Sequence, residues 1–184
     1  MAGPLDLHLL AEALKNACVS ILNTLPSYDP ELKGAPDRHF THYGIPVWDC
    51  CEQLAVHAVL LSEAETTPGG LDAGQRANRY ARLNHVRLTA SLTRCVTSVG
   101  EMPAMGDYHP PTPEALTVDA KQHHADAWAL WNLLFNLKAS GDFLTLCDAF
   151  FFEGILPFAP AGGCAGWTVV VRAVLGGYQE PAGS

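Results

Sequence analysis

Apolar residues recur every three or four positions in two stretches of the chain, a spacing that predicts amphipathic helices. The first stretch covers residues 5–24 and is stopped by Pro26. Residues 27–42 are polar and rich in turn formers, so we expect a loop or a short extended arm there. The apolar stripe of this first helix consists of Leu7, Leu10, Leu14, Cys18, Ile21 and Leu25.

The second helix is predicted over 113–138, and both of its ends have recognisable signals. Thr112 is a good N-cap residue, Pro113 suits the first helical position and Glu114 places an acid in the first turn. Gly141 marks the end of the helix. Its apolar stripe consists of Leu116, Ala120, His123, Ala127, Leu130, Leu134 and Leu137, with Trp128 and Trp131 beside it.

Alternating apolar and polar positions predict strands in the rest of the chain. One strand is expected over 45–61, of which 52–61 belongs to the sheet, a second over 85–96 and a last one over 167–175. The densely apolar segment 143–158 precedes the last strand and is expected to pair with it. The residues expected on the inward face are Leu54, Val56, Ala58, Leu60, Val86, Leu88, Ala90, Leu92, Val96, Trp167, Val169, Val171, Ala173 and Leu175.

The predicted order of elements is helix, strand, strand, helix, strand, strand, which makes two hairpins separated by a helix. This order favours an α+β fold with a mainly antiparallel sheet and two helices packed on one face. The alternation also predicts that the other face of the sheet is wet. We expect a single domain over 1–184, long loops at 62–82 and 97–111, and a flexible tail at 177–184.

The chain is more apolar and less charged than an average soluble domain, with 48% hydrophobic and 16% charged residues. A monomer hides that much apolar surface with difficulty, so a partner surface is expected. The net charge of −8 argues against a broad nucleic-acid-binding face, which needs clustered Lys and Arg. We expect no membrane contact and synthesis in the cytoplasm, because the sequence lacks a long apolar run and a signal peptide.

The six cysteines, at positions 18, 50, 51, 95, 147 and 164, have irregular spacing and form no CxxC pair. In a reducing cytoplasm they are expected to remain thiols and to serve as small, buried apolar residues. Cys51 and Cys95 both fall in predicted strands, so a later disulfide between these two stays open as an alternative.

Several positions suggest chemistry that has to be weighed against a structural role. Asp119 and His123 are one helical turn apart, but a metal site needs three or four converging ligands, so a core or interface histidine is favoured. Cys51 and His57 are on the order of 20 Å apart along a straight strand, which excludes their direct pairing, and an approach of His85 or His42 to the cysteine through the fold stays open. The segment 162–166 is glycine-rich but precedes a strand, which favours a tight connection over a phosphate cradle. We predict no catalytic residue, no metal ligand and no cofactor.

Three segments of the chain have distinctive sequences, namely 47–54 (VWDCCEQL), 92–95 (LTRC) and 162–169 (GGCAGWTV). They resemble the neck proteins of siphophages that infect actinobacteria. The layout of helix, two strands, helix and closing strands is similar to the tail-terminator family of long-tailed phages over nearly the whole chain. That family has no catalytic residues to transfer.

The resemblance implies a structural virion protein that forms a ring, commonly a hexamer, which ends tail-tube growth and docks onto the capsid connector. The implied partners are further copies of the chain, the major tail tube protein and the capsid-side stopper or connector. The implied location is the neck of the virion, after assembly in the host cytoplasm. DNA would pass through the lumen without sequence-specific binding, and an acidic wall does not hold a passing duplex.

Two alternatives remain open. Another neck component would belong to the same class, but stoppers are typically small β-barrels and adaptors mostly helical bundles, whereas this chain predicts both helices and Val/Thr-rich strands. A small cytoplasmic enzyme that depends on a metal or a thiol would belong to a different class.

A ring subunit needs apolar surface beyond its own core, and the segment before the last strand supplies it. Consecutive residues of a strand point to opposite faces, so Phe151 must point away from its two neighbours. We predict that at least one of five residues packs against an adjacent protomer. These are Phe150, Phe151, Phe152, Ile155 and Phe158.

Overall fold

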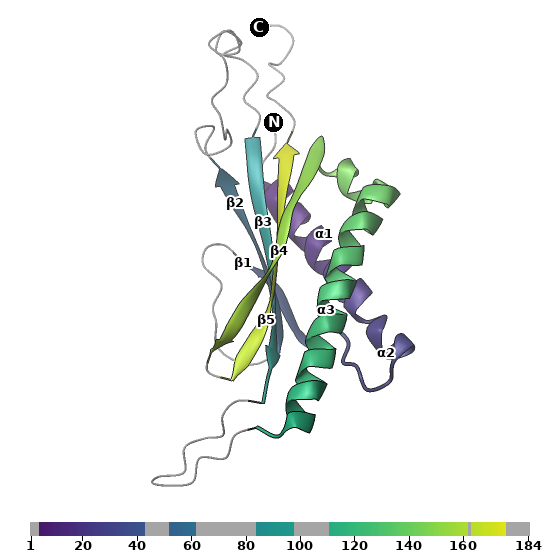
Figure 1. Cartoon of the computed structure of the whole chain (residues 1–184). Coiled ribbons are helices and arrows are strands. Elements are labelled where there is room, and N and C mark those ends of the chain that lie inside the picture. The colour runs from purple at the N-terminus through teal and green to yellow at the C-terminus, as the bar shows by residue number, and fades with distance from the viewer. Residues whose placement is uncertain (1–3, 43–51, 62–83, 98–110, 162, 176–184) are drawn as a thin grey trace, which may run out of the picture.

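Five strands form a single sheet in the described part of the chain, and the two long helices lie together on one of its faces (Figure 1). The structure is a computed structural model that describes residues 4–42, 52–61, 84–97, 111–161 and 163–175. The helices are α1 (Pro4–Leu22), the short α2 (Leu25–Tyr28), α3 (Pro113–Ser140) and the 3₁₀ turn η2 (Asp142–Thr145). The strands are β1 (Arg38–His42), β2 (Gln53–Leu61), β3 (Asn84–Cys95), β4 (Ala149–Ala161) and β5 (Cys164–Leu175).

The strands are arranged in the order β1-β2-β3-β5-β4. β1 runs parallel to β2, and all other neighbours are antiparallel. The predicted α+β class, a mainly antiparallel sheet with two helices on one face, is therefore confirmed. The prediction for 27–42 is corrected in one detail, because this segment was expected to hold only a loop or an extended arm but contains the strand β1. Its burial along the strand does not alternate, so the period-2 signal of a strand is missing.

Both long helices occur where the apolar spacing places them. The side chain of Thr112 caps α3 by accepting a hydrogen bond of 3.2 Å from the backbone N–H of Ala115. Gly141 ends the helix with φ 71°, a left-handed conformation that glycine adopts at low cost. Pro26 lies in the first turn of α2. Proline is tolerated there because the N–H that it lacks would have no partner within the helix.

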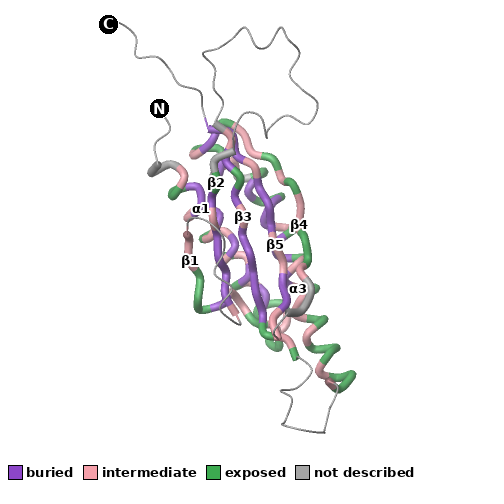
Figure 2. Tube along the Cα trace, turned by 90° about the vertical axis from the view of Figure 1, so that its left-hand side faces the viewer, coloured by how far each residue is buried: buried purple, intermediate pink, exposed green. Residues whose placement is uncertain are grey.

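The core lies between the helices and the side of the sheet that faces them (Figure 2). The described strand residues predicted to point inward are buried, except Trp167 and Val96, which are partly exposed. Trp167 packs against the core, and its indole N–H donates a hydrogen bond of 3.0 Å to the backbone oxygen of His123. The helices contribute Leu10, Leu14, Cys18, Leu22, Leu130, Leu133, Leu134 and Leu137.

Two expectations about exposure are wrong. The second face of the sheet is not uniformly wet, because several of its residues are buried, namely Gln53, Ala55, Ser91, Thr93, Val170 and Val174. The ring of Phe158 covers part of this face, because it lies over Gly166 in the space that a Cβ atom would fill. Leu116 and Ala120 were predicted in the inward stripe of α3 but are exposed. The first turns of this helix lie away from the strands (Figure 2).

Some predicted features fall outside the described residues. These are the first part of the strand expected over 45–61, the loop at 62–82, the loop at 97–111 apart from Thr97 and Pro111, and the tail at 177–184. They stay predictions, as does the assignment of 1–184 to one domain.

Candidate assembly surface

Four large aromatic residues of α3 and β4 are about half exposed, although tryptophan and phenylalanine are usually well buried. The exposed fractions are 54% for Trp128, 48% for Trp131, 57% for Phe135 and 57% for Phe151. Single exposed apolar residues are common on protein surfaces, but a cluster of large ones marks a contact site.

Three of these residues line one groove between the second half of α3 and the edge strand β4. The groove has a volume of about 330 Å³. Trp131 stands edge-to-face on both Phe135 and Phe152, with ring centroids 5.5 Å apart in each pair, an arrangement that aromatic rings prefer. We call this the aromatic groove, and its lining consists of Trp131, Leu134, Phe135, Lys138, Phe150, Phe151 and Phe152.

The consecutive phenylalanines of β4 alternate as predicted. Phe150 and Phe152 are partly buried and pack against the core, and Phe150 stands edge-to-face on Phe143 at 5.2 Å. Phe151 pairs across the strand with Arg172 on the other face and is exposed. It is therefore the outward-facing member of the three.

The other two predicted contact residues are less exposed than Phe151. Ile155 is partly buried and packs against the core, and Phe158 is partly buried over Gly166. The sequence did not single out Phe135 or Leu156, which are 57% and 58% exposed. The available signal for Phe135 was its position one turn after Trp131 on the same helix face.

β4 is an edge strand whose backbone is poorly suited to pairing with another strand. Its register against β5 shifts between Phe152 and Gly154 and again between Phe158 and Ala161. Pro157 has no N–H to donate. Bulges and prolines are devices that keep edge strands from pairing with other chains. A contact at this edge would therefore rest on side chains rather than on backbone hydrogen bonds.

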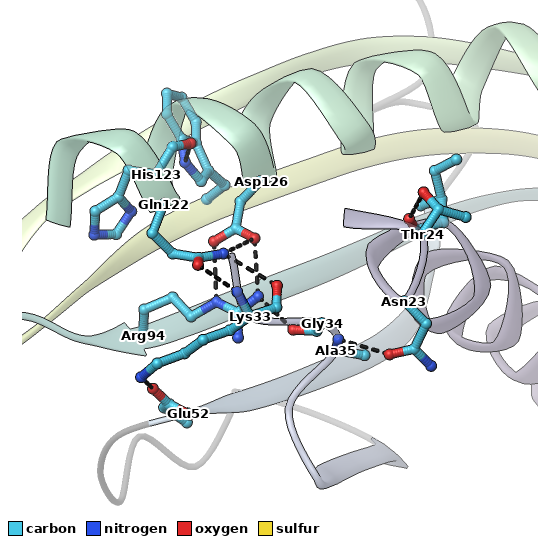
Figure 3. A network of polar contacts seen from close by, with 12 residues as sticks. Asn23, Thr24, Lys33, Gly34, Ala35, Glu52, Arg94, Gln122, His123 and Asp126 are labelled. Carbon is cyan, nitrogen blue, oxygen red and sulfur yellow. Dashed lines mark hydrogen bonds and ion pairs between the residues drawn. The ribbon is translucent and has the colours of Figure 1, made fainter. Parts of the chain in front are cut away.

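A buried ion pair holds the middle of α3 to the sheet (Figure 3). The guanidinium of Arg94, on β3, donates two hydrogen bonds of 2.8 and 3.0 Å to the two carboxylate oxygens of Asp126, on α3. The exposed fractions of the two side chains are 2% and 0%. The same guanidinium donates to the backbone oxygen of Gly34 at 2.7 Å. We call this pair, with its hydrogen-bond partners, the polar clamp.

Gln122 extends the polar clamp to the segment after α2. Its amide N–H donates to Asp126 at 3.0 Å, and its oxygen accepts a hydrogen bond of 2.7 Å from the backbone N–H of Lys33. Asn23, the residue that follows α1, accepts a hydrogen bond of 2.9 Å from the backbone N–H of Ala35. The network in Figure 3 therefore joins three elements of the fold, and its buried charges are paired within the chain.

On the second face of the sheet, Glu153 forms ion pairs with two arginines. It contacts Arg87 at 3.3 Å and also pairs with Arg172. The three side chains come from β4, β3 and β5, and each is partly exposed. Exposed pairs of this kind stabilise a fold only slightly.

Within the described residues, the positions considered for chemistry do not assemble into a site. No group of three or more His, Cys, Asp or Glu residues among the described residues could hold a metal ion. Burial lowers the pKa of His123, and Asp119 accepts a hydrogen bond of 2.7 Å from the backbone N–H of Thr97. Burial also lowers the pKa of His57, whose ring lies 5.7 Å from that of His42. Cys51 lies outside the described residues.

The glycine-rich segment is a tight connection, as predicted. Ala161 and Cys164 are cross-strand partners, so Gly162 and Gly163 alone separate β4 from β5. Gly163 has φ 78°, which favours glycine at that position. β5 thus begins at Cys164, three residues before the predicted start.

Comparison of the chain with protein-family models, with curated proteins and with solved structures finds no match. None of the helices in the described ranges is both long and apolar enough to cross a bilayer. The fold and its surfaces are therefore the observations from which the function is inferred.

Proposed function

We propose that the chain is the tail terminator of a long-tailed bacteriophage, a structural protein whose subunits form a ring that ends tail-tube growth and joins the tail to the capsid connector. The observation on which the proposal rests is the aromatic groove, where large aromatic side chains remain exposed beside a buried core. We infer that the assembly is a phage neck ring from the resemblance of three sequence segments to siphophage neck proteins.

The aromatic groove supports assembly because aromatic side chains contribute more to protein interfaces than other residues do. Trp131 and Phe135 are held in place by their edge-to-face contact, so little conformational entropy is lost when a partner covers them. The outward Phe151 lies at the rim of the same groove. The expected occupant is a second copy of the chain.

A ring requires a heterologous contact, in which one patch binds a different patch on the neighbour. The described part of the chain has a second exposed apolar region on the N-terminal half of α3. Leu116 and Val118, in the first turns of this helix, are 50% and 65% exposed. Two separate apolar patches on one chain fit head-to-tail association better than a symmetric dimer.

Another neck ring, a stopper or an adaptor, is the nearest alternative. A five-stranded mixed sheet covered by two long helices is neither a small β-barrel nor a helical bundle, which favours the terminator. A small metal- or thiol-dependent enzyme is the alternative from another class.

The experiment that tests the proposal has two parts. In the first, the purified chain is examined by electron microscopy, by mass in solution and for bound metal. Rings without stoichiometric metal are expected, whereas a monomer that holds a stoichiometric metal would favour the enzyme. In the second, the chain is added to polymerising major tail tube protein. A terminator shortens the tubes and caps one end, whereas a stopper or an adaptor leaves tube length unchanged.

A further inference from the structure

Two cysteines face each other across the β3–β5 ladder. Cys95 is the last residue of β3, Cys164 is the first residue of β5, and the two are direct cross-strand partners. The sequence suggested a different pair, Cys51 with Cys95, because both fall in predicted strands, whereas Cys164 was expected in a loop before the last strand. Only the observed register brings Cys164 opposite Cys95.

The hydrogen bonds around this pair determine its spacing. The backbone N–H of Val96 donates to the oxygen of Gly163 at 2.9 Å, so Cys95 and Cys164 occupy the non-hydrogen-bonded position next to it. In such a position the Cα atoms are about 4.5 Å apart and both side chains point to the same face of the sheet. Disulfides span Cα distances of about 4.4–6.8 Å, so the ladder already holds the two residues at a bonding distance.

The two thiols also differ from the other described cysteines in accessibility. Cys95 is exposed and Cys164 is partly exposed, whereas Cys18 and Cys147 are buried. Burial raises the pKa of Cys18 to about 12 and that of Cys147 to about 11, so neither forms a thiolate readily. Among the described cysteines, only the β3–β5 pair is both accessible and correctly spaced.

We propose that Cys95 and Cys164 form a redox-responsive disulfide that joins the end of β3 to the start of β5. The oxidant is a low-molecular-weight disulfide. The thiolate of Cys95 attacks it, and one thiol leaves. The thiolate of Cys164 then attacks the mixed disulfide at the Cys95 sulfur, and the second thiol leaves. The protein loses two protons and two electrons, and the oxidant is reduced to two thiols.

The bond would stabilise the chain because it closes a loop of roughly 70 residues that includes all of α3. A reducing cytoplasm keeps the pair as thiols, and an oxidising exterior allows the bond to form. The protein would therefore assemble in the reduced form and become locked at this end of the sheet after release from the cell. The proposal does not depend on ring formation.

The test treats the full-length chain with glutathione disulfide and digests it with trypsin without reduction. Mass spectrometry is expected to find peptide 95–121 joined to peptide 139–172, with the loss of two hydrogen atoms. The second peptide also contains Cys147, so Cys147→Ser serves as the matched control and should retain the link, whereas Cys164→Ser should abolish it. Oxidation should raise Tm by about 5–10 °C, a shift that the double variant Cys95→Ser with Cys164→Ser should not show.

Three results would overturn the proposal. The first is glutathione left attached to Cys95 without an internal link. The second is a link from Cys95 to the peptide that contains Cys50 and Cys51, which would restore the alternative suggested by the sequence. The third is a link from peptide 95–121 that survives in Cys164→Ser, which would assign the partner to Cys147.

Discussion

The polar clamp and the aromatic groove both lie along α3, yet they differ in whether the chain completes them. In the polar clamp, Arg94 and Asp126 are almost fully buried and each is satisfied by partners from the same chain. In the aromatic groove, Trp131 and Phe135 remain about half exposed and contact mainly each other and β4. One helix therefore stabilises the fold through the buried polar clamp and presents an exposed apolar surface at the aromatic groove.

The largest effect is expected when the polar clamp is broken. Asp126→Ala leaves the buried guanidinium of Arg94 without its carboxylate and should lower the free energy of unfolding by about 3–5 kcal/mol. Urea unfolding followed by tryptophan fluorescence measures this. A double variant, Arg94→Met with Asp126→Leu, removes both charges and should recover most of the loss. A loss below about 1 kcal/mol in Asp126→Ala would mean that the pair does not hold the helix to the sheet.

Two glycines of the β4–β5 hairpin, Gly166 and Gly154, differ in how much space surrounds them. A Cβ atom at Gly166 would lie 1.8 Å from the backbone oxygen of Leu92, so Gly166→Ala must separate two central strands. Its cost should be about 3 kcal/mol or more. At Gly154 nothing lies within 4 Å of the added atom, so Gly154→Ala should change stability by less than about 1 kcal/mol. Equal losses in the two variants would contradict the packing described for the second face.

The smallest of these stability effects is a pH dependence. Burial lowers the pKa values of His57, His85 and His123 from the ordinary 6.5. As the pH falls through 6.5, the unfolded chain therefore binds protons that the folded chain does not, and the folded state loses stability. Tm should fall between pH 7.5 and pH 5.5. Replacement of the three histidines by glutamine should flatten this slope, and an unchanged slope would assign the effect to other groups.

Much of the fold could be predicted because its signals are local. The spacing of Leu10, Leu14 and Cys18 gave α1, the capping residue Thr112 and Gly141 gave the ends of α3, and the alternation from Val86 to Leu92 gave the inward face of β3. β1 was missed because a short edge strand lacks an alternating pattern. The start of β5 was misplaced because only its pairing with β3 extends it back to Cys164.

The polar clamp was not predicted, although a signal for it was present. Arg94 falls on the inward face of an alternating strand, and Asp126 lies between His123 and Leu130 on the inward side of a helix. Two opposite charges on inward faces indicate a buried pair, but only the tertiary structure shows that they meet. For the aromatic groove, the alternation at Phe151 was predicted, whereas the contribution of Phe135 depends on how α3 packs on β4.

The central claim is that the aromatic groove binds a second copy of the chain in a head-to-tail contact, and mass in solution tests it most directly. Phe151→Asp places a charge at the rim of the groove, where a contact would bury it without a partner. Val118→Asp does the same in the second patch. Leu9→Asp is the matched control, since Leu9 is 46% exposed on α1, on a different element.

Sedimentation and electron microscopy of these variants give a clear outcome. The native chain and Leu9→Asp should form rings, and the Phe151 and Val118 variants should fold normally but stay monomeric. A mixture of the two monomeric variants should form dimers and no rings, because only one intact contact remains between them. Rings that persist in Phe151→Asp would contradict the account and place the subunit contact elsewhere on the chain.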